Sequence, residues 1–312
     1  MIILRRLKTM KKFRIAQFCM VLSLVLLFSG VVTAEVEDSL FDSQQKSQTD
    51  WEKSVVRAKG YGVAAEHMKN EAQARILARE AAITMAQRRL LEVIKGVNIN
   101  STQTVKNAQI QSDVIKKRVA GLIKGAKIIE EKQPAEGTYM VVLEVKFYGQ
   151  DGIMKAILPK LKDQTGSNDS SELQVNETNK GQEKQTTAPQ STEFDKQNLG
   201  KYTGVIINTI NVNLEPAMFP KIYSANNKLV YGIDMLNSDG VITNGIVGYN
   251  RSLNAAKANP RVGSNPLVVN AQGAAGDTKA DLVLAAADAR KVKRIGSKNN
   301  IFKNNKVIIV LN

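Results

Sequence analysis

The chain has 312 residues, of which 43% are hydrophobic and 23% charged, and its formal net charge at pH 7 is +15. This composition is typical of a globular protein, and the length allows two domains that each bury a core. The only cysteine, Cys19, lies in an apolar N-terminal run. The rest of the sequence therefore excludes a disulfide scaffold, a cysteine metal site and a cysteine nucleophile.

The first 34 residues have the pattern of a secretory signal peptide. Basic residues precede the apolar run 15–28, and small residues follow it up to Ala34. We predict cleavage between Ala34 and Glu35, and a periplasmic or secreted location. A retained membrane anchor is the alternative, but the apolar run is shorter than the ~20 residues that a spanning helix needs. A start at Met10 would leave the cleavage site unchanged.

The charge that remains after cleavage points to the partners available in a cell envelope. Residues 1–34 contain six of the 44 basic residues and none of the 29 acidic ones, so their removal leaves a formal charge of +9. The polyanions of an envelope are lipid headgroups, lipopolysaccharide and wall polymers rather than nucleic acid. The sequence therefore favours peripheral contact with such surfaces over nucleic-acid binding.

The amino-acid composition changes at one segment of the chain, and this segment separates two parts of the sequence. Residues 162–198 are rich in Ser, Thr, Gln, Asn, Lys and Glu and poor in aliphatic residues, so they cannot bury enough apolar surface to offset the entropy of ordering. We predict a disordered, flexible linker at 162–198 between a domain at 51–160 and a second domain at 201–312.

The first domain is predicted to be α+β, with an antiparallel sheet and two helices on one face. Its expected β-α-α-β-β order consists of a strand at 54–58, helices at 66–95 and 112–124, and strands at 126–133 and 138–148. Ser112 is the expected cap of the second helix, and Pro134 to Gly137 form the expected hairpin turn.

The long helix is predicted to have two apolar sides. We expect one side to hold Ala72, Ile76, Ile83, Leu90 and Ile94, and the other Ala74, Ala78, Ala81 and Met85. An alanine side lets a sheet or a second helix approach closely, and we expect the second side to meet the sheet.

The second domain is also predicted to be a mixed α+β domain, with several strands and few helices. The expected strands lie at 202–210, 219–224, 228–232, 265–271, 281–286 and 306–312, and the expected helices at 251–258 and 286–295. The sequence does not give the order of these strands in a sheet.

Gly60-Tyr61-Gly62 raises the question of a dinucleotide-binding fingerprint. Such a fold needs a second strand soon after the helix and an acidic residue about 20 positions beyond the glycines. Here the helix continues to Lys95, and residues 96–105 contain no acidic side chain. We therefore interpret the two glycines as a flexible join between an edge strand and the long helix, and we predict no cofactor.

No catalytic residue and no metal site is predicted. His67 is the only histidine, and no serine or cysteine motif accompanies it. Residues 237–245 resemble part of a calcium loop, but the first and twelfth positions would be Met235 and Ile246, which cannot bind calcium. Other carboxylates are expected to be caps or turn residues: Asp234, Asp277, Asp281 and Asp288.

The densest charge cluster lies at residues 290–306, with Phe302 inside it. Its candidate anion-binding residues are Arg290, Lys291, Lys293, Arg294, Lys298, Lys303 and Lys306. They could bind an anionic partner. They could equally form a solvated helix end, where basic side chains interact favourably with the helix dipole.

Residues 51–149 resemble a known bacterial family. The stretches WEKSVVRAKGYGVAAE and SDVIKKRVAGLIKGAKIIEE, with the long helix between them, resemble the small outer-membrane lipoprotein family founded on a twenty-kilodalton lipoprotein, which is similar to the N-terminal domain of flagellar assembly protein T. The resemblance implies a noncatalytic α+β envelope domain, linked in some relatives to flagellar or surface assembly. The chain lacks the acylated cysteine of the lipoproteins, since Phe18 precedes Cys19 where a small residue is needed.

These features lead to one expected function and two alternatives. We expect an exported, nonenzymatic envelope protein that binds or scaffolds an envelope protein partner. The first alternative is a module that binds lipopolysaccharide or peptidoglycan through the C-terminal basic cluster. A carboxylate-based hydrolase is the second alternative.

Overall fold

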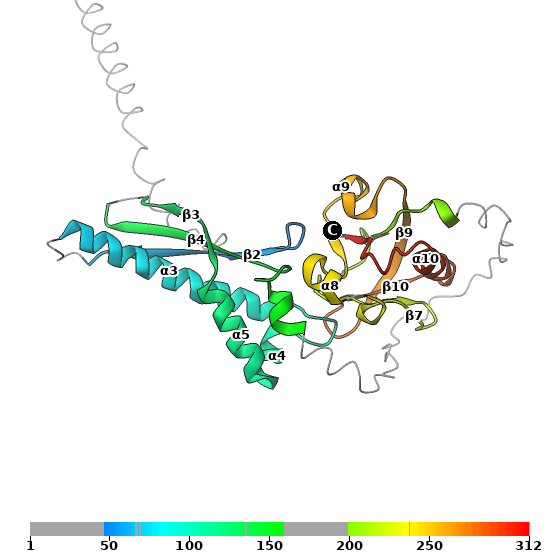
Figure 1. Cartoon of the computed structure of the whole chain (residues 1–312), viewed down its shortest axis with the longest axis horizontal. Coiled ribbons are helices and arrows are strands. Elements are labelled where there is room, and N and C mark those ends of the chain that lie inside the picture. The colour runs from blue at the N-terminus through cyan, green and yellow to red at the C-terminus, as the bar shows by residue number, and fades with distance from the viewer. Residues whose placement is uncertain are drawn as a thin grey trace, which may run out of the picture. The chain divides into compact units, whose positions relative to one another are not determined.

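A computed structural model describes residues 47–65, 68, 70–134, 136–158, 199–236 and 238–311. These residues form an α+β protein with one sheet in each half of the chain, as predicted (Figure 1). From residue 47 onward they belong to one compact unit. The predicted signal peptide, with Ala34 and Glu35, and the predicted linker at 162–198 lie outside the described residues. No helix in the described ranges is long and apolar enough to span a membrane.

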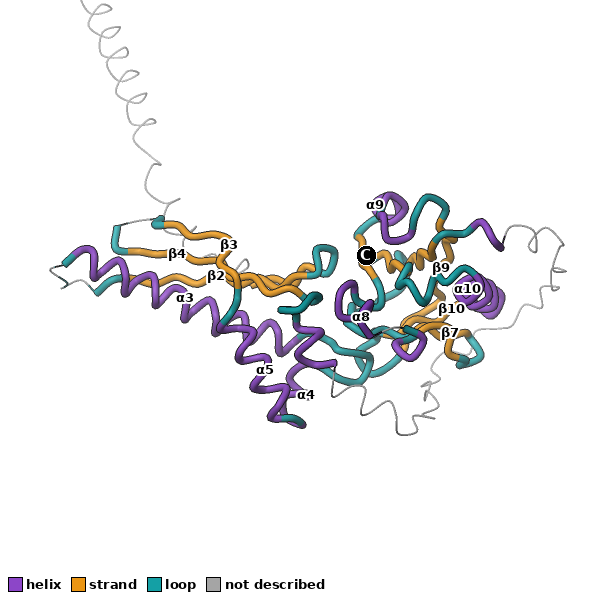
Figure 2. The backbone as a smooth tube through the Cα atoms, viewed as in Figure 1, coloured by secondary structure: helices purple, strands orange, loops and turns teal. Residues whose placement is uncertain are grey.

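The N-terminal domain contains a four-stranded antiparallel sheet of order β1-β2-β4-β3. Its elements are β1 (Ser47–Asp50), β2 (Val55–Val63), α3 (Glu71–Gly96), α4 (Val105–Gln111), α5 (Asp113–Lys124), β3 (Lys127–Lys132) and β4 (Thr138–Lys146). Helix α3 packs along β2 and β4, as Figure 2 shows. Strand β2 lies inside the sheet and reaches Val63, so the predicted edge strand that ends at Ala58 was wrong.

Helix α3 meets the sheet along one narrow stripe. Asn70 caps the helix by accepting a hydrogen bond from the backbone N–H of Gln73, so α3 begins later than predicted. The buried positions recur every four residues, at Ala78, Ala82, Ala86, Leu90 and Ile94. The prediction of two apolar sides was wrong: Ile76 is 60% exposed and Met85 is 37% exposed.

Gly60 and Gly62 allow this close approach between helix and strand. A Cβ atom at Gly60 would lie 2.0 Å from the backbone oxygen of Ala82, and one at Gly62 would lie 1.9 Å from that of Ala78. Both glycines belong to β2, opposite Val141 and Tyr139 of β4. They are therefore packing positions within a strand, and the predicted flexible join at Gly60-Tyr61-Gly62 was wrong.

Other local predictions for this domain agree with the structure, but β1, α4 and the helical residues 153–158 were not predicted, and β1 lies before the predicted start of the domain at residue 51. Ser112 caps α5 by accepting from the backbone N–H of Ile115, and Gly137 turns the β3–β4 hairpin with a φ of 71°. Helix α4 is short, is capped by Thr104, and buries only Val105 and Ala108, so its sequence carries little amphipathic signal.

The C-terminal domain contains a seven-stranded mixed sheet of order β7-β6-β10-β9-β5-β11-β8. Its strands are β5 (Gly204–Asn208), β6 (Ile222–Ser224), β7 (Leu229–Tyr231), β8 (Gly248–Asn250), β9 (Pro266–Ala275), β10 (Asp281–Leu284) and β11 (Val307–Val310). Strand β11 has parallel partners on both sides and is buried throughout. This position explains its uninterrupted run of aliphatic residues.

Helices cover both faces of this sheet. They are α8 (Ser238–Asn244), α9 (Leu253–Ala258) and α10 (Ala286–Lys298), with short 3-10 helices at Leu199–Lys201, Ile233–Met235 and Pro260–Val262. Val292 and Ile295 of α10 share a core with Ile207 and Ile309, whereas Ala256 of α9 lies in a second cluster with alternate residues of the same strands. Strand β8 and helix α8 were not predicted, and α8 lies wholly within the calcium-like stretch 237–245.

The loop after α3 joins the two domains, and we call these contacts the domain joint. The backbone oxygens of Asn98 and Ile99 accept hydrogen bonds from the backbone N–H groups of Met218 and Phe219, at 3.0 and 2.7 Å. The backbone N–H of Thr278 donates to the oxygen of Ser101 at 2.9 Å. Backbone groups of the loop are thus paired with the C-terminal domain rather than with water.

A buried carboxylate lies at the centre of the domain joint. Asp281 is 1% exposed, and it accepts from the hydroxyl of Ser101 at 2.6 Å and from the backbone N–H of Lys221 at 2.8 Å. Burial raises the pKa of Asp281 above its ordinary value, and the two hydrogen bonds oppose part of that rise. The sequence-based interpretation of Asp281 as a cap or turn residue was wrong.

This raised pKa gives a pH-dependent prediction. The folded protein binds the Asp281 proton more tightly than the unfolded chain does, so this group favours folding increasingly as the pH falls from 7 through its folded pKa. Asp281→Asn removes the titration. In urea titrations, we expect the unfolding free energy of the wild type minus that of this variant to increase as the pH is lowered from 7 to 4. A constant difference would contradict the buried carboxylate.

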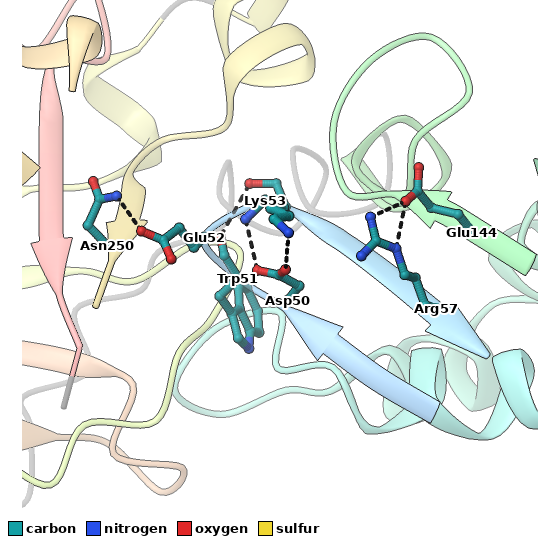
Figure 3. A network of polar contacts seen from close by, with 8 residues as sticks. Asp50, Trp51, Glu52, Lys53, Arg57, Glu144 and Asn250 are labelled. Carbon is teal, nitrogen blue, oxygen red and sulfur yellow. Dashed lines mark hydrogen bonds and ion pairs between the residues drawn. The ribbon is translucent and has the colours of Figure 1, made fainter. Parts of the chain in front are cut away.

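A second group of contacts joins the domains near β1. Trp51 packs against Phe147 and Tyr249, with ring centroids 4.6 and 5.4 Å apart. Figure 3 shows the neighbouring amide of Asn250, which donates to Glu52 at 2.8 Å. Because Trp51 is the only tryptophan of the chain, its fluorescence reports on this contact.

Candidate anion-binding surface

Helix α10 presents a basic stripe on the side that faces away from the core. Its buried residues are Ala289, Val292, Ile295 and Gly296. Arg290, Arg294 and Lys298 follow one another in steps of four and are all exposed. Side chains four residues apart share one face of a helix. We call these three residues the basic stripe.

Two other basic residues of the predicted cluster lie beside the stripe and contact neighbouring groups. The ammonium of Lys291 lies 5.8 Å from the centre of the Tyr202 ring. The ammonium of Lys293 donates to the backbone oxygen of Leu229 at 3.3 Å. Beyond the helix, Lys303 is exposed and Lys306 is half-buried. The structure therefore places three of the seven predicted residues together on one exposed face.

Phe302 does not belong to this surface. It is buried, its ring lies 4.7 Å from that of Tyr231, and it occupies the space that a Cβ atom on Gly296 would take. The aromatic residue inside the charge cluster is therefore a core residue that holds the turn after α10. The sequence pattern could not show this, because basic residues surround Phe302 on both sides.

The charges of the stripe lack nearby compensation. None of Arg290, Arg294 and Lys298 forms an ion pair with a carboxylate among the residues that the structure describes. The helix dipole accounts for Lys298 in the last turn, but Arg290 is the fifth of 13 residues and gains nothing from the C-terminal end. The helix dipole therefore does not account for the position of Arg290.

The other residues considered from sequence do not come together as a site. Asp277 is exposed and Asp288 lies in the first turn of α10, while Asp281 belongs to the domain joint. His67 and the side chain of Asp234 lie outside what the structure describes. In the described part of the chain, no three His, Cys, Asp or Glu residues are grouped so that they could hold a metal ion.

Comparison with known families places the basic stripe inside a recognised domain. Residues 204–312 match the family model described as Treponema pallidum Tp0624, second domain. This match covers about a third of the chain and includes α10 and the whole seven-stranded sheet. No curated protein matches the chain. The Tp0624 second-domain match does not extend to residues 51–149, so it does not bear on their resemblance to the lipoprotein family.

Proposed function

We propose that the protein is an exported, noncatalytic component of a bacterial cell envelope that binds another surface protein and holds it as a scaffold. The domain joint is the observation that carries this proposal. A buried hydrogen bond between Ser101 and Asp281, with backbone pairs on either side, fixes the two domains to each other. Such contacts limit the relative motion of the two domains, so a partner protein would meet both domain surfaces in one arrangement.

The envelope setting of this proposal rests on sequence. The predicted signal peptide at residues 1–34 supports export, and the resemblance of residues 51–149 supports a role in surface or flagellar assembly. The match of residues 204–312 to a second domain of a Treponema pallidum protein agrees with a bacterial source. No step of the proposed role requires chemistry at a catalytic residue.

Affinity capture from intact envelopes tests this scaffold role. The mature chain from Glu35 onward, carrying a photoactivatable cross-linker on the exposed surface, should recover one envelope protein reproducibly. An unrelated exported protein of similar net charge serves as the control. Recovery of the same proteins by bait and control would contradict the proposal.

The basic stripe supports a second candidate function, the binding of an anionic envelope polymer such as lipopolysaccharide or peptidoglycan. Three exposed cations on one face, without ion-pair partners in the described residues, are suited to a row of phosphates or carboxylates. The polymer-binding candidate rests on the basic stripe and the scaffold role on the domain joint. An experiment can therefore contradict one of them without contradicting the other.

Charge reversal tests the polymer-binding candidate. The variant Arg290→Glu, Arg294→Glu, Lys298→Glu should bind lipopolysaccharide or anionic vesicles at least about tenfold more weakly, since each basic residue near such a surface contributes ~1 kcal/mol. Wild-type binding should also fade as the Debye length falls from ~10 Å at 0.1 M salt to ~3 Å at 1 M. Co-sedimentation measures both effects.

The matched control carries the same charge change on another exposed helix. Lys116→Glu, Lys117→Glu, Lys124→Glu alters α5, where all three side chains are exposed. If both triple variants lose binding equally, net charge is responsible and the stripe is not a site. Equal binding by wild type and the α10 variant at low salt would also remove this candidate.

A further inference from the structure

A pocket is lined mainly by residues of the N-terminal domain, with Ile242 of α8 contributed by the C-terminal domain. Its volume is about 890 Å³, and it opens between the C-terminal half of α5, the start of β3, the end of β4 and the helical residues 153–158. Small-molecule sites in proteins typically have volumes of ~300–1,000 Å³. The pocket is therefore large enough for an organic ligand.

Much of the pocket wall is apolar and free of obstruction. Leu122, Ala126, Val145 and Leu158 line it with aliphatic side chains. Gly121 contributes backbone alone, and a Cβ atom added there would have no neighbour within 4 Å. Such a wall favours a hydrocarbon chain, because a hydrocarbon chain gains most of its binding free energy from the removal of apolar surface from water.

The charged side chains that line the pocket are mostly cations. Four of them are basic, namely Arg118, Lys127, Lys146 and Lys155. The carboxylate of Glu144 is already held by Arg57, whose Nε and Nη2 donate to it at 2.8 and 2.7 Å (Figure 3). Lys155 donates to the neutral side chain of Gln150, so its charge is not cancelled. Asp151 is the other acidic residue of the lining.

We propose that this pocket binds a single-chain anionic amphiphile, a fatty carboxylate. The apolar wall takes the acyl chain, and the cations of α5, β3 and the 153–158 helix take the carboxylate. Charge-assisted hydrogen bonds from arginine or lysine to a carboxylate favour this head group over a neutral one. The proposal uses no residue of α10 or of the domain joint, so it does not depend on the proposed function.

A fluorescent fatty acid tests the proposal on the mature chain from Glu35 onward. cis-Parinaric acid should show saturable binding with increased emission. Laurate should displace it, whereas n-dodecanol, which lacks the charge, and inorganic phosphate, which lacks the chain, should displace it at least about tenfold less well. Failure to saturate would overturn the proposal. Equal displacement by dodecanol would show that the pocket does not prefer an anionic head group. Equal displacement by phosphate would show that the acyl chain does not contribute to binding.

Two pairs of variants locate the binding in this pocket. Gly121→Leu should reduce the affinity at least about tenfold by filling the pocket, and leucine is a better helix former than glycine. Gly96→Leu is its control, because Gly96 is also helical, has open space and does not line the pocket. Arg118→Gln with Lys155→Gln should weaken binding of laurate but not of dodecanol. Lys116→Gln with Lys117→Gln should change neither. Unchanged laurate affinity in the Gly121 variant would overturn the assignment.

Discussion

Replacement of Gly62 by valine is expected to prevent stable folding of the N-terminal domain. The added Cβ would lie 1.9 Å from the backbone oxygen of Ala78 and 2.6 Å from the backbone nitrogen of Ala82. Both are backbone atoms of α3, so a side-chain rotation cannot relieve the contact, and the helix must separate from β2. We expect a loss of at least ~3 kcal/mol in the free energy of unfolding. Urea unfolding followed by circular dichroism and Trp51 fluorescence measures it.

Gly96→Ala is the control for this substitution. Gly96 ends α3, and a Cβ atom there meets no atom within 4 Å. Alanine should leave the stability unchanged or raise it by up to ~1 kcal/mol, because it is the better helix former. If Gly62→Val unfolds at the same urea concentration as the wild type, the close packing of α3 on β2 is wrong.

Replacement of Asp281 by alanine is the second change with a large expected effect. It removes the acceptor for both the Ser101 hydroxyl and the Lys221 backbone N–H inside the domain joint. Two buried donors are left unpaired, which costs about 2–4 kcal/mol in the free energy of unfolding. The domains should also separate before they unfold, so unfolding followed by Trp51 fluorescence should precede the loss of helical circular dichroism.

Asp277→Ala is the matched control for the domain joint. This aspartate is four residues earlier in the chain and is exposed, so its removal should change the stability by less than ~0.5 kcal/mol. Equal effects of the two substitutions would show that the buried carboxylate does not hold the joint.

Local signals in the sequence were sufficient to predict most of the helices and strands. The Ser112 cap, the Pro134 to Gly137 turn and the aliphatic runs of β5 and β11 each specify structure within a few residues. Both domains were therefore predicted as α+β. The strand order of the second sheet could not be predicted, since the pairing of β5 with β9 and β11 joins residues that are far apart in the chain.

Packing between elements was harder to predict than the elements themselves. An alanine on α3 looks the same whether it faces water or a glycine of β2. Only the contact of Ala82 with Gly60 and Gly62 distinguishes the buried stripe from the alternatives. The burial of Asp281 in the domain joint was also not predictable from the local sequence, because its partner Ser101 is 180 residues away.

The candidate site was predictable in composition but not in arrangement. Helical spacing places Arg290, Arg294 and Lys298 on one face once the helix is known to reach Lys298 rather than Ile295. The contacts of Lys291 and Lys293, and the burial of Phe302, depend on neighbours that the local sequence does not reveal.

The fixed arrangement of the two domains is the central claim, and a distance measurement across the domain joint tests it most directly. The chain from Glu35 onward has no cysteine, so cysteines replacing the exposed Lys117 of α5 and Lys257 of α9 can carry two spin labels without other changes. We predict a single narrow distance distribution by pulsed electron spin resonance, and a broader one when Asp281→Ala is added. A broad distribution in the wild-type background would contradict the account.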